Sequence, residues 1–347
     1  MQKRKAVTLQ DIAAKTGLSI QTISKALRGM PGMSEQSRHH IFQLAKEMGY
    51  RSKEQEQAHT IEHIPLRSSK TYRFKLIVSA RTDSYDMNPL ILDGLQKKMI
   101  EYGHTVEQIA LASDDSLSIQ QWVKLHQLEY CDGLFLTPTL PTDQIDYLLT
   151  CAIPRVLIHF PTPRWKVDSV IWDAGTAVYQ SVQYLLAQGH RRVLYVGELD
   201  TAIRGFVMRW DAFRMAMAEH GIEAREEEHL IHIRGLERDM KIQHLLDQVR
   251  ERQATAVLCG VSYHLPWVYQ ACTMSGLRIP EDVSLISLED TVNAYIPELS
   301  RPLLLIRESG ARAAERMLWR IANPNAPYEH TMLQGDFYKG ATVVSCV

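Results

Sequence analysis

The sequence predicts an α/β protein with a small N-terminal three-helix helix-turn-helix head and a larger, two-lobed body of doubly wound parallel sheets. Three short amphipathic helix patterns fill residues 1–51, and a glycine separates the first two. From residue 74 to residue 347, short apolar runs of strand length alternate with amphipathic helix patterns. Alternating strands and helices of this kind build parallel sheets with helices on both faces.

The charge of the chain is divided unevenly between these two parts. Residues 1–75 contain 14 Lys and Arg and 6 Asp and Glu, a net charge of +8, whereas the remaining residues carry a net charge of −9. A basic head on an acidic body favours a polyanionic partner for the head, although a charged surface without a partner would have the same composition.

Composition and the N-terminus argue against several classes of protein. Apolar residues make up 45% and charged residues 23% of the chain, as in ordinary globular proteins, and no apolar run is long enough to cross a membrane. The basic N-terminus is not followed by the apolar run of a signal peptide, so we expect a cytoplasmic protein. Five scattered cysteines without a CxxC pair favour reduced thiols, and we expect no metal and no cofactor.

The first helix of the head has a start signal and a stop signal. Thr8 can cap the helix, and Asp11 follows three residues later, a pattern typical of a capping box. Ile12 lies on the apolar face of this helix, and Gly17 can end it in the left-handed conformation. We expect Leu18 to pack inward across the turn.

Two further helices complete the head. Ser19 can cap the second, in which Ile23 faces the first helix, and Ser34 can cap the third, which Gly49 ends. Three short helices with a glycine turn after the first form a helix-turn-helix, and the second helix of this motif lies in the DNA major groove.

The outward positions of the second helix carry side chains that suit DNA. Gln21 can form paired hydrogen bonds to adenine, Lys25 can reach guanine acceptors, and Ile20 can contact a thymine methyl group. Candidate phosphate contacts are Ser19, Thr22, Ser24 and Arg28, and the capping residues Thr8 and Ser34 are further candidate DNA contacts. From the helical pattern alone, a three-helix bundle with a polar face is the alternative, since polar faces are common.

The stretch VTLQDIAAKTGLSIQTISKALRGMPGMSEQSRHHIFQLAKEMGYR closely resembles the DNA-binding head of the lactose-repressor (LacI/GalR) family, almost without a gap over the first 51 residues. The combination of TLQDIAAKTGLS, TISKAL, MSEQSR and MGYR is specific. This resemblance implies a bacterial transcription regulator, most often a repressor, that binds a partly palindromic DNA operator as a homodimer.

The segment 52–73, SKEQEQAHTIEHIPLRSSKTYR, reads as a polar linker. In the family it carries a short hinge helix whose leucine enters the minor groove at the operator centre. That pattern is absent here, and Glu54 and Glu56 place negative charge where phosphates would lie. We therefore expect a degenerate hinge that stays flexible on DNA, bends it little and depends weakly on the central base pairs.

The body, residues 74–347, also resembles the effector domain of the family, which has a periplasmic-binding-protein-like fold. The segments DGLFLTP, LLAQGHRRVLYVG, RWDAFRMAM and GLRIPEDVSLISLED stand in family order. Family connectivity implies lobe one at about 74–172 and 303–335 and lobe two at about 173–302 and 336–347, with a ligand cleft between them. Ligands of such sheets bind outside the carboxyl ends of the strands.

The resemblance implies three polar ligand contacts in this cleft. Arg209, in RWDAF, matches the arginine that binds ligand hydroxyls or carboxylates, and a planar guanidinium suits either. Asp173 matches the acid at the lobe boundary, and Glu289 falls in the segment SLED. The chain departs from the family at Val261-Ser262, where Asn-Asp is usual.

Losing polar groups in this way argues against an ordinary sugar, because hydroxyl-rich ligands need many directed donors and acceptors. A less polar ligand would lie near four aromatic side chains, which are Tyr85, Phe160, Tyr263 and Trp267. For each aromatic residue, packing in the core is the alternative to ligand contact. A cleft that binds no ligand is the remaining alternative.

The sequence contains no GxSxG, HExxH or phosphate-cradling loop, so we expect no enzyme. The predicted function is sequence-specific DNA binding by a dimeric transcription regulator, with a small-molecule effector in the cleft and no membrane association. A regulator controlled by a protein partner is the first alternative. A solute-binding or enzymatic protein is the second, opposed by the missing signal peptide and the missing catalytic groups.

Overall fold

The computed structural model describes the following residues of the chain: 7–27, 30, 33–48, 50, 71–80, 87–111, 118–289 and 292–346. The predicted linker up to residue 70, together with Arg28, Gly49 and Tyr85, lies outside the described residues. The chain divides into two units, formed by residues 1–170 with 307–331 and by residues 171–306 with 332–347.

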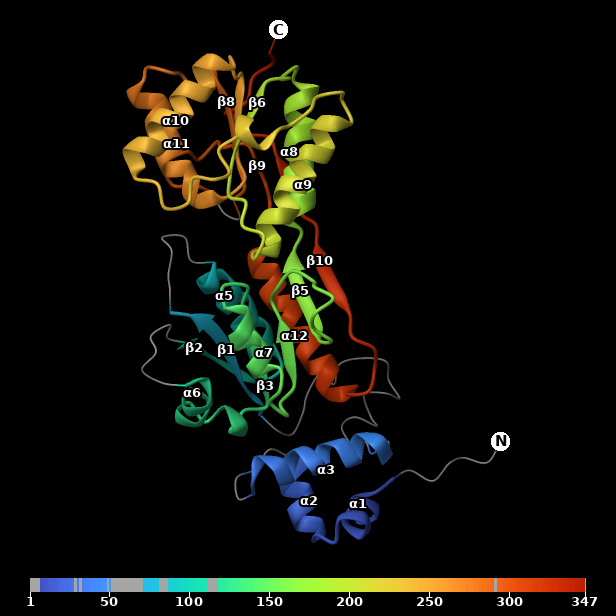
Figure 1. Cartoon of the computed structure of the whole chain (residues 1–347). Coiled ribbons are helices and arrows are strands. Elements are labelled where there is room, and N and C mark those ends of the chain that lie inside the picture. Colours follow the sequence, from blue (N-terminus) through green and yellow to red (C-terminus); the bar gives the residue numbers. More distant parts are fainter. Residues whose placement is uncertain are drawn as a thin grey trace, which may run out of the picture. The chain divides into compact units, whose positions relative to one another are not determined.

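Three helices form the head, namely α1 (Leu9–Thr16), α2 (Ile20–Leu27) and α3 (Glu35–Met48) (Figure 1). The predicted capping box is present, since the Thr8 hydroxyl accepts from the Asp11 N–H and the Asp11 carboxylate accepts from the Thr8 N–H at 2.7 Å. Gly17 ends α1 with φ of 70°, a left-handed conformation that favours glycine. The start and stop signals of the first helix are therefore confirmed.

Each helix of the head contributes to one small core. Its buried members are Ile12, Ile23, Ala26, Ile41 and Ala45. The prediction for Leu18 was wrong, because this side chain is 40% exposed. Leu18 lies between Gly17, which ends α1, and Ser19, which caps α2, and the side chains at this turn face solvent.

The first unit is built on a six-stranded sheet in the order β10-β5-β4-β3-β1-β2. Its strands are β1 (Arg73–Ser79), β2 (Thr105–Leu111), β3 (Gly133–Leu136), β4 (Arg155–Leu157), β5 (Asp168–Trp172) and β10 (His330–Leu333). Its helices are α5 (Asn88–Glu101), α6 (Ile119–Leu125), α7 (Thr142–Leu148) and α12 (Ile306–Ala322), with the short η1 (Leu128–Tyr130). The pairs from β2 through β5 are parallel, as the alternating pattern predicts.

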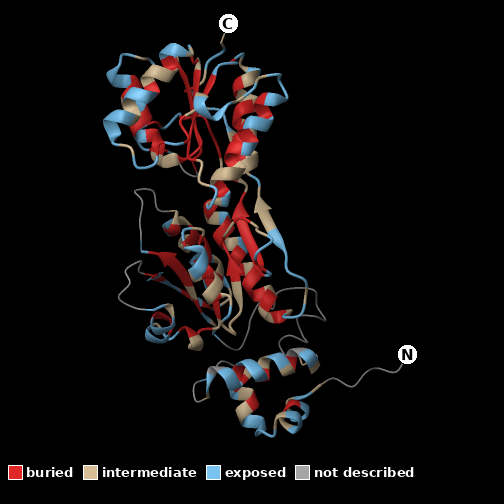
Figure 2. Cartoon of the chain, in the orientation of Figure 1, coloured by how far each residue is buried: buried red, intermediate tan, exposed pale blue. Residues whose placement is uncertain are grey.

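The second unit contains a parallel three-stranded sheet, in the order β6-β7-β8, and an antiparallel pair. The strands are β6 (Val193–Val196), β7 (Ala256–Cys259), β8 (Ser284–Ser287), β9 (Arg301–Pro302) and β11 (Phe337–Tyr338). The helices are α8 (Ala174–Ala187), α9 (Arg204–Ala218), α10 (Arg238–Glu251) and α11 (Leu265–Met274), with the short η2 (Glu226–Glu228) and η3 (Ser262–His264). Most strand residues of both units are buried (Figure 2).

One apolar run of the second unit, at 227–233, does not form a named strand. The segment 227–233, EEHLIHI, begins within η2 and then makes a single parallel bridge, from Leu230 to Val196. Leu230, Ile231 and Ile233 are buried, but the first two residues of the segment lie in the 3-10 turn η2, so only its later part is extended beside β6.

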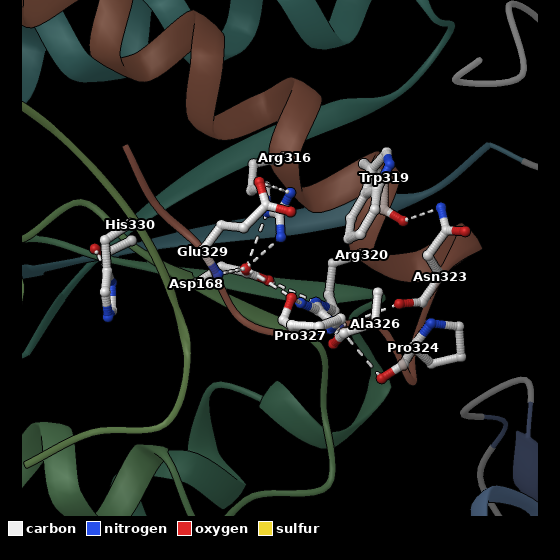
Figure 3. A network of polar contacts seen from close by, with 11 residues as sticks. Asp168, Arg316, Trp319, Arg320, Asn323, Pro324, Ala326, Pro327, Glu329 and His330 are labelled. Atoms are coloured by element: carbon white, nitrogen blue, oxygen red, sulfur yellow. Dashed lines mark hydrogen bonds and ion pairs between the residues drawn. The ribbon is translucent and has the colours of Figure 1, made fainter. Parts of the chain in front are cut away.

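A buried ionic network joins α12 to β5 in the first unit (Figure 3). Asp168 is fully buried and accepts hydrogen bonds from Arg316 at 2.9 and 2.7 Å and from Arg320 at 2.5 and 3.2 Å. Arg320 also donates to the backbone carbonyls of Asn323, Pro324, Ala326 and Pro327. Burial by itself raises the pKa of Asp168, but the hydrogen bonds from Arg320, from the Glu329 N–H and from Arg316 outweigh it and lower that pKa.

Candidate functional site

The second helix of the head presents the predicted base-reading residues to solvent. Ile23 and Ala26 are fully buried on one face of α2, whereas Ile20 is 44% exposed and Gln21 and Lys25 are exposed. This division follows from the helical period, which separates the residues of the core face from those of the outer face. Among the described residues of α2, the outer face therefore carries an amide, an ammonium group and an aliphatic side chain.

The hydroxyl groups at the starts of α2 and α3 cap these helices. Ser19 Oγ accepts from the Thr22 N–H at 3.1 Å and lies 2.8 Å from Thr22 Oγ1. Ser34 Oγ accepts from the Ser37 N–H at 3.2 Å. Both serines are exposed, so the N-termini of the two helices face solvent, with the backbone polarity that favours a phosphate.

Other candidates in the head have different surroundings. The Thr8 hydroxyl donates to the Asp11 carboxylate at 2.7 Å, so it is engaged within the cap of α1. Ser24 is half-buried on α2, and Arg28 lies outside the described residues. Leu18, which the sequence assigns to the core, is exposed immediately before the Ser19 cap and adds an apolar side chain that sequence reasoning missed.

The candidate effector residues of the second unit lie on different elements: Tyr263 follows β7, Glu289 follows β8 and Asp173 follows β5. Arg209, on α9, is 8% exposed, and its guanidinium lies 5.8 Å from the Phe206 ring. Burial lowers the pKa of Arg209, while Tyr195 and Tyr263 act in the opposite direction.

Sequence reasoning missed Tyr195, a fully buried tyrosine of β6. Its ring occupies the space over two glycines, since a Cβ on Gly197 would lie 2.5 Å from the ring and one on Gly260 would lie 2.0 Å from its hydroxyl. The pKa of Tyr195 is raised by burial, against the charge of Arg209. A tyrosine in the middle of the apolar strand RRVLYVG gives no signal that its hydroxyl reaches the end of the sheet.

Tyr263 and Trp267, two aromatic candidates of the second unit, both contact His264. Tyr263 and His264 have ring centroids 4.5 Å apart, and Trp267 Nε1 donates to His264 Nδ1 at 3.1 Å. Trp267 is 7% exposed and belongs to the core of the second unit. Phe160 is buried in the first unit, and Tyr85 lies outside the described residues.

The two acidic candidates, Asp173 and Glu289, each form hydrogen bonds with a residue two or three positions away. Asp173 caps α8, because its carboxylate accepts from the Thr176 N–H at 2.9 Å and from the Thr176 hydroxyl at 2.7 Å. Glu289, which follows β8, is 6% exposed, and Ser287 Oγ lies 3.3 Å from its carboxylate. Asp173 therefore has a structural role at the start of α8, whereas Glu289 is a buried acid near the end of a sheet.

Comparisons with known proteins match both parts of the chain. Residues 8–53 match the model of the bacterial regulatory proteins of the lacI family, and residues 182–343 match that of the periplasmic binding protein-like domain. The chain belongs to the LacI family. It is thus a DNA-binding transcription regulator whose body has the periplasmic-binding-protein-like fold.

The similarity to known regulators extends over nearly the whole of this LacI-family chain. The ribose operon repressor of Haemophilus influenzae is 26% identical over 337 residues, which cover 94% of this chain and 96% of that protein. The catabolite control protein A of Priestia megaterium is 22% identical, covering 91% of this chain and 92% of that protein. The first is named a repressor and the second a control protein.

Solved structures of LacI-family proteins share the fold. The lac repressor dimer bound to operator has a TM-score of 0.65 and 18% identity, covering 98% of this chain and 100% of that chain. A complex of the regulator CelR with cellobiose has a TM-score of 0.65 and 19% identity, covering 97% and 99% of the two chains. In the described part of this chain, no helix has the length and apolar character needed to cross a membrane.

Proposed function

We propose that this LacI-family regulator represses transcription in the bacterial cytoplasm by binding a partly palindromic operator as a homodimer. The head, residues 1–51, reads the DNA, residues 52–73 link it to the body, and residues 74–347 bind the effector and pair two chains. A small molecule bound by the body changes the affinity of the two heads for the operator.

The observation that carries the DNA-binding part is the exposed face of α2. Gln21 and Lys25 are exposed on this helix, while its opposite face is fixed in the core of the head by Ile23 and Ala26. A rigid helix that presents an amide and an ammonium group can hydrogen-bond base edges in the major groove. Exposed caps at Ser19 and Ser34 would position the helix against phosphates.

Pairing of two heads follows from the small size of one head. Three helices offer too little surface to hold one half-site tightly, so two heads joined through the body gain affinity by acting together. A solved relative, the lac repressor, is described as a dimer bound to operator. Palindromy of the operator would mirror the two-fold symmetry of the protein.

Effector binding is assigned to the carboxyl ends of β6, β7 and β8, with Arg209 as the main polar contact. Arg209 is buried, and its planar guanidinium can bind both oxygens of a carboxylate, so it favours a ligand with a carboxylate or a similar acceptor over a neutral sugar. The remaining candidates are the aromatic residues Tyr263, Trp267, Phe160 and Tyr85 and the acids Asp173 and Glu289.

Footprinting of the full-length protein on the DNA upstream of its own gene tests the DNA-binding part. A protected, partly palindromic sequence is expected, and its absence on all upstream and neighbouring promoters would contradict the proposal. Thermal-shift measurements against carboxylates and neutral sugars test the effector part, with Arg209→Ala as the comparison. Equal binding of neutral sugars by both proteins would show that Arg209 does not select the ligand.

A further inference from the structure

Two large apolar side chains of the head lie on its surface, on either side of the residue that caps α2. Leu18 is 40% exposed and Ile20 is 44% exposed, and Ser19 stands between them. Neither belongs to the half-buried residues that pack against the core of the head, which are Leu9, Ala13, Leu27, Met33, Leu44, Met48 and Tyr50. In the described part of the head, the apolar surface of both side chains thus remains open to a partner.

The cap fixes where these two side chains stand. Ser19 Oγ accepts from the Thr22 N–H at 3.1 Å, and the Ser19 carbonyl accepts from the Ile23 N–H at 3.0 Å, so Ser19 is the last residue before α2. A capping residue has an extended backbone, and the side chains before and after an extended residue lie on the same side of the chain. Leu18 and Ile20 therefore form one apolar pair at the N-terminal end of α2.

Packing within the head is the alternative role for Leu18. A leucine before a cap often packs on the fourth residue of the helix, here Ile23, and stabilises the start of that helix. Ile23 is fully buried, whereas two fifths of Leu18 is exposed. A contact within the head would affect stability, while a contact of the exposed part with DNA would affect sequence preference, so experiment can separate the two roles.

The end of α2 that carries this pair is the end that reads bases in the proposed function. Gln21 is exposed in the same turn, and Lys25 is exposed one turn later. Residues 1–75 carry a net charge of +8, which attracts the head to a DNA duplex. In the major groove, the C5-methyl group of thymine is the apolar group that a base edge presents. Thymine methyl groups are thus the part of DNA that fits an apolar pair beside an amide and an ammonium group.

We propose that Leu18 and Ile20 pack against the C5-methyl groups of two thymines in each operator half-site. Leu18, which precedes the helix, adds a second methyl contact to the one expected from Ile20 and is a specificity-determining residue of the head. Such a contact removes apolar surface from water and distinguishes thymine from cytosine, which has no methyl group at C5. This inference rests on the proposed function, because it requires α2 to lie in the major groove.

The first test selects bound sequences from a random-sequence DNA library with the full-length protein, its Leu18→Ala variant and its Leu125→Ala variant. Leu125 is 65% exposed on α6 of the body, so this variant deletes the same side chain from an exposed helix outside the head. The parent protein and Leu125→Ala should select thymine at two positions in each half-site. Leu18→Ala should lose the preference at one of these positions and keep it at the other.

Deoxyuridine then isolates the methyl group, because it pairs as thymidine does and lacks only the C5-methyl group. In one half-site of the selected duplex, it replaces the thymine that depends on Leu18. This replacement should weaken binding by the parent protein and by Leu125→Ala about fourfold, the effect of one buried methyl group. The affinity of Leu18→Ala should not change. Leu18→Met, which keeps an apolar side chain of similar volume, should retain the thymine preference.

Other results would overturn the inference. If Leu18→Ala lowers the thermal midpoint, weakens binding to all sequences by the same factor and stays as sensitive to deoxyuridine as the parent protein, Leu18 only supports the fold of the head. If the parent protein binds the thymine and deoxyuridine duplexes equally, the methyl contact is absent, while base reading by Gln21 and Lys25 stands. If the parent protein selects no sequence from the library, the DNA-reading part of the proposed function fails, and this inference fails with it.

Discussion

Arg316 donates two hydrogen bonds to one oxygen of Asp168, from Nε at 2.9 Å and from Nη2 at 2.7 Å, across 148 residues of chain. Arg320, one turn further along α12, donates to the same carboxylate. Asp168 is 0% exposed, and the two arginines are each 6% exposed. Asp168 therefore pairs with both buried guanidinium groups, Glu329 adds a second ion pair to Arg316 at 2.8 Å, and the network holds α12 against β5.

Replacing this carboxylate should destabilise the first unit strongly. Asp168→Asn removes the negative charge while leaving Arg316 and Arg320 buried, and breaking a buried pair in this way costs about 3–5 kcal/mol. Urea unfolding followed by tryptophan fluorescence measures the change. Glu223→Gln, which alters an exposed pair with Arg225, serves as the control and should leave the unfolding midpoint almost unchanged. A similar midpoint for both variants would contradict the role of the network.

Base reading by α2 is tested by separate alanine variants of Gln21 and Lys25. Each should reduce the discrimination between operator and random DNA, because a good base contact contributes about 1–3 kcal/mol. Lys124→Ala, on helix α6 of the body, removes a charge of the same sign and should not alter discrimination. Titrations at several salt concentrations measure both properties, and unchanged specificity in both head variants would rule out the assignment.

A phosphate contact gives a different result in the same titrations. Arg28→Ala should weaken binding to all sequences by a similar factor and reduce the slope of binding against salt by about one unit. A loss confined to the operator would instead place Arg28 on a base edge.

Dimer formation predicts both a mass and an operator geometry. Sedimentation at micromolar concentration should give twice the mass of the 39.7 kDa chain. The half-sites should lie about one helical turn, or a multiple of it, apart. Inserting five base pairs between them turns one half-site to the opposite face of the DNA and should weaken binding. A stable monomer that binds one half-site with full affinity would refute the dimer.

Burial of His264 predicts a pH dependence of stability. Its pKa is lowered from 6.5 to about 4 in the folded protein, so the unfolded chain binds the extra proton between these values. Stability should therefore be full above pH 6.5 and decrease as the pH falls toward 4, by up to about 3 kcal/mol from this group. Unfolding midpoints between pH 4.5 and 7.5 measure the slope.

A variant without the titrating group should have a flatter pH profile. His264→Asn is expected to be less stable at pH 7, because Trp267 loses its acceptor, and to lose less stability on acidification. His244→Gln, an exposed histidine on α10, is the control and should retain the profile of the parent protein. An identical slope in the His264 variant would assign the acid sensitivity to other groups.

The sequence by itself determined the local elements and the family of this chain. Thr8, Asp11 and Gly17 mark the bounds of α1 through hydrogen bonds between residues three or four positions apart. Both partners of each bond therefore lie within the same short stretch of sequence. The alternation of strands and helices likewise predicts parallel pairing, because each apolar run must be buried between covering helices. Exposed Gln21 and Lys25 follow from the helical period.

Only the tertiary structure decided which polar groups share one environment. Asp168 meets Arg316 and Arg320, and Glu198 faces His264, across separations that no local pattern encodes. The exposure of Leu18 and the single bridge at Leu230 likewise became visible only in the tertiary structure. The physical reason is that burial and electrostatic surroundings are properties of the packed chain, whereas caps and periodicity are properties of a few consecutive residues.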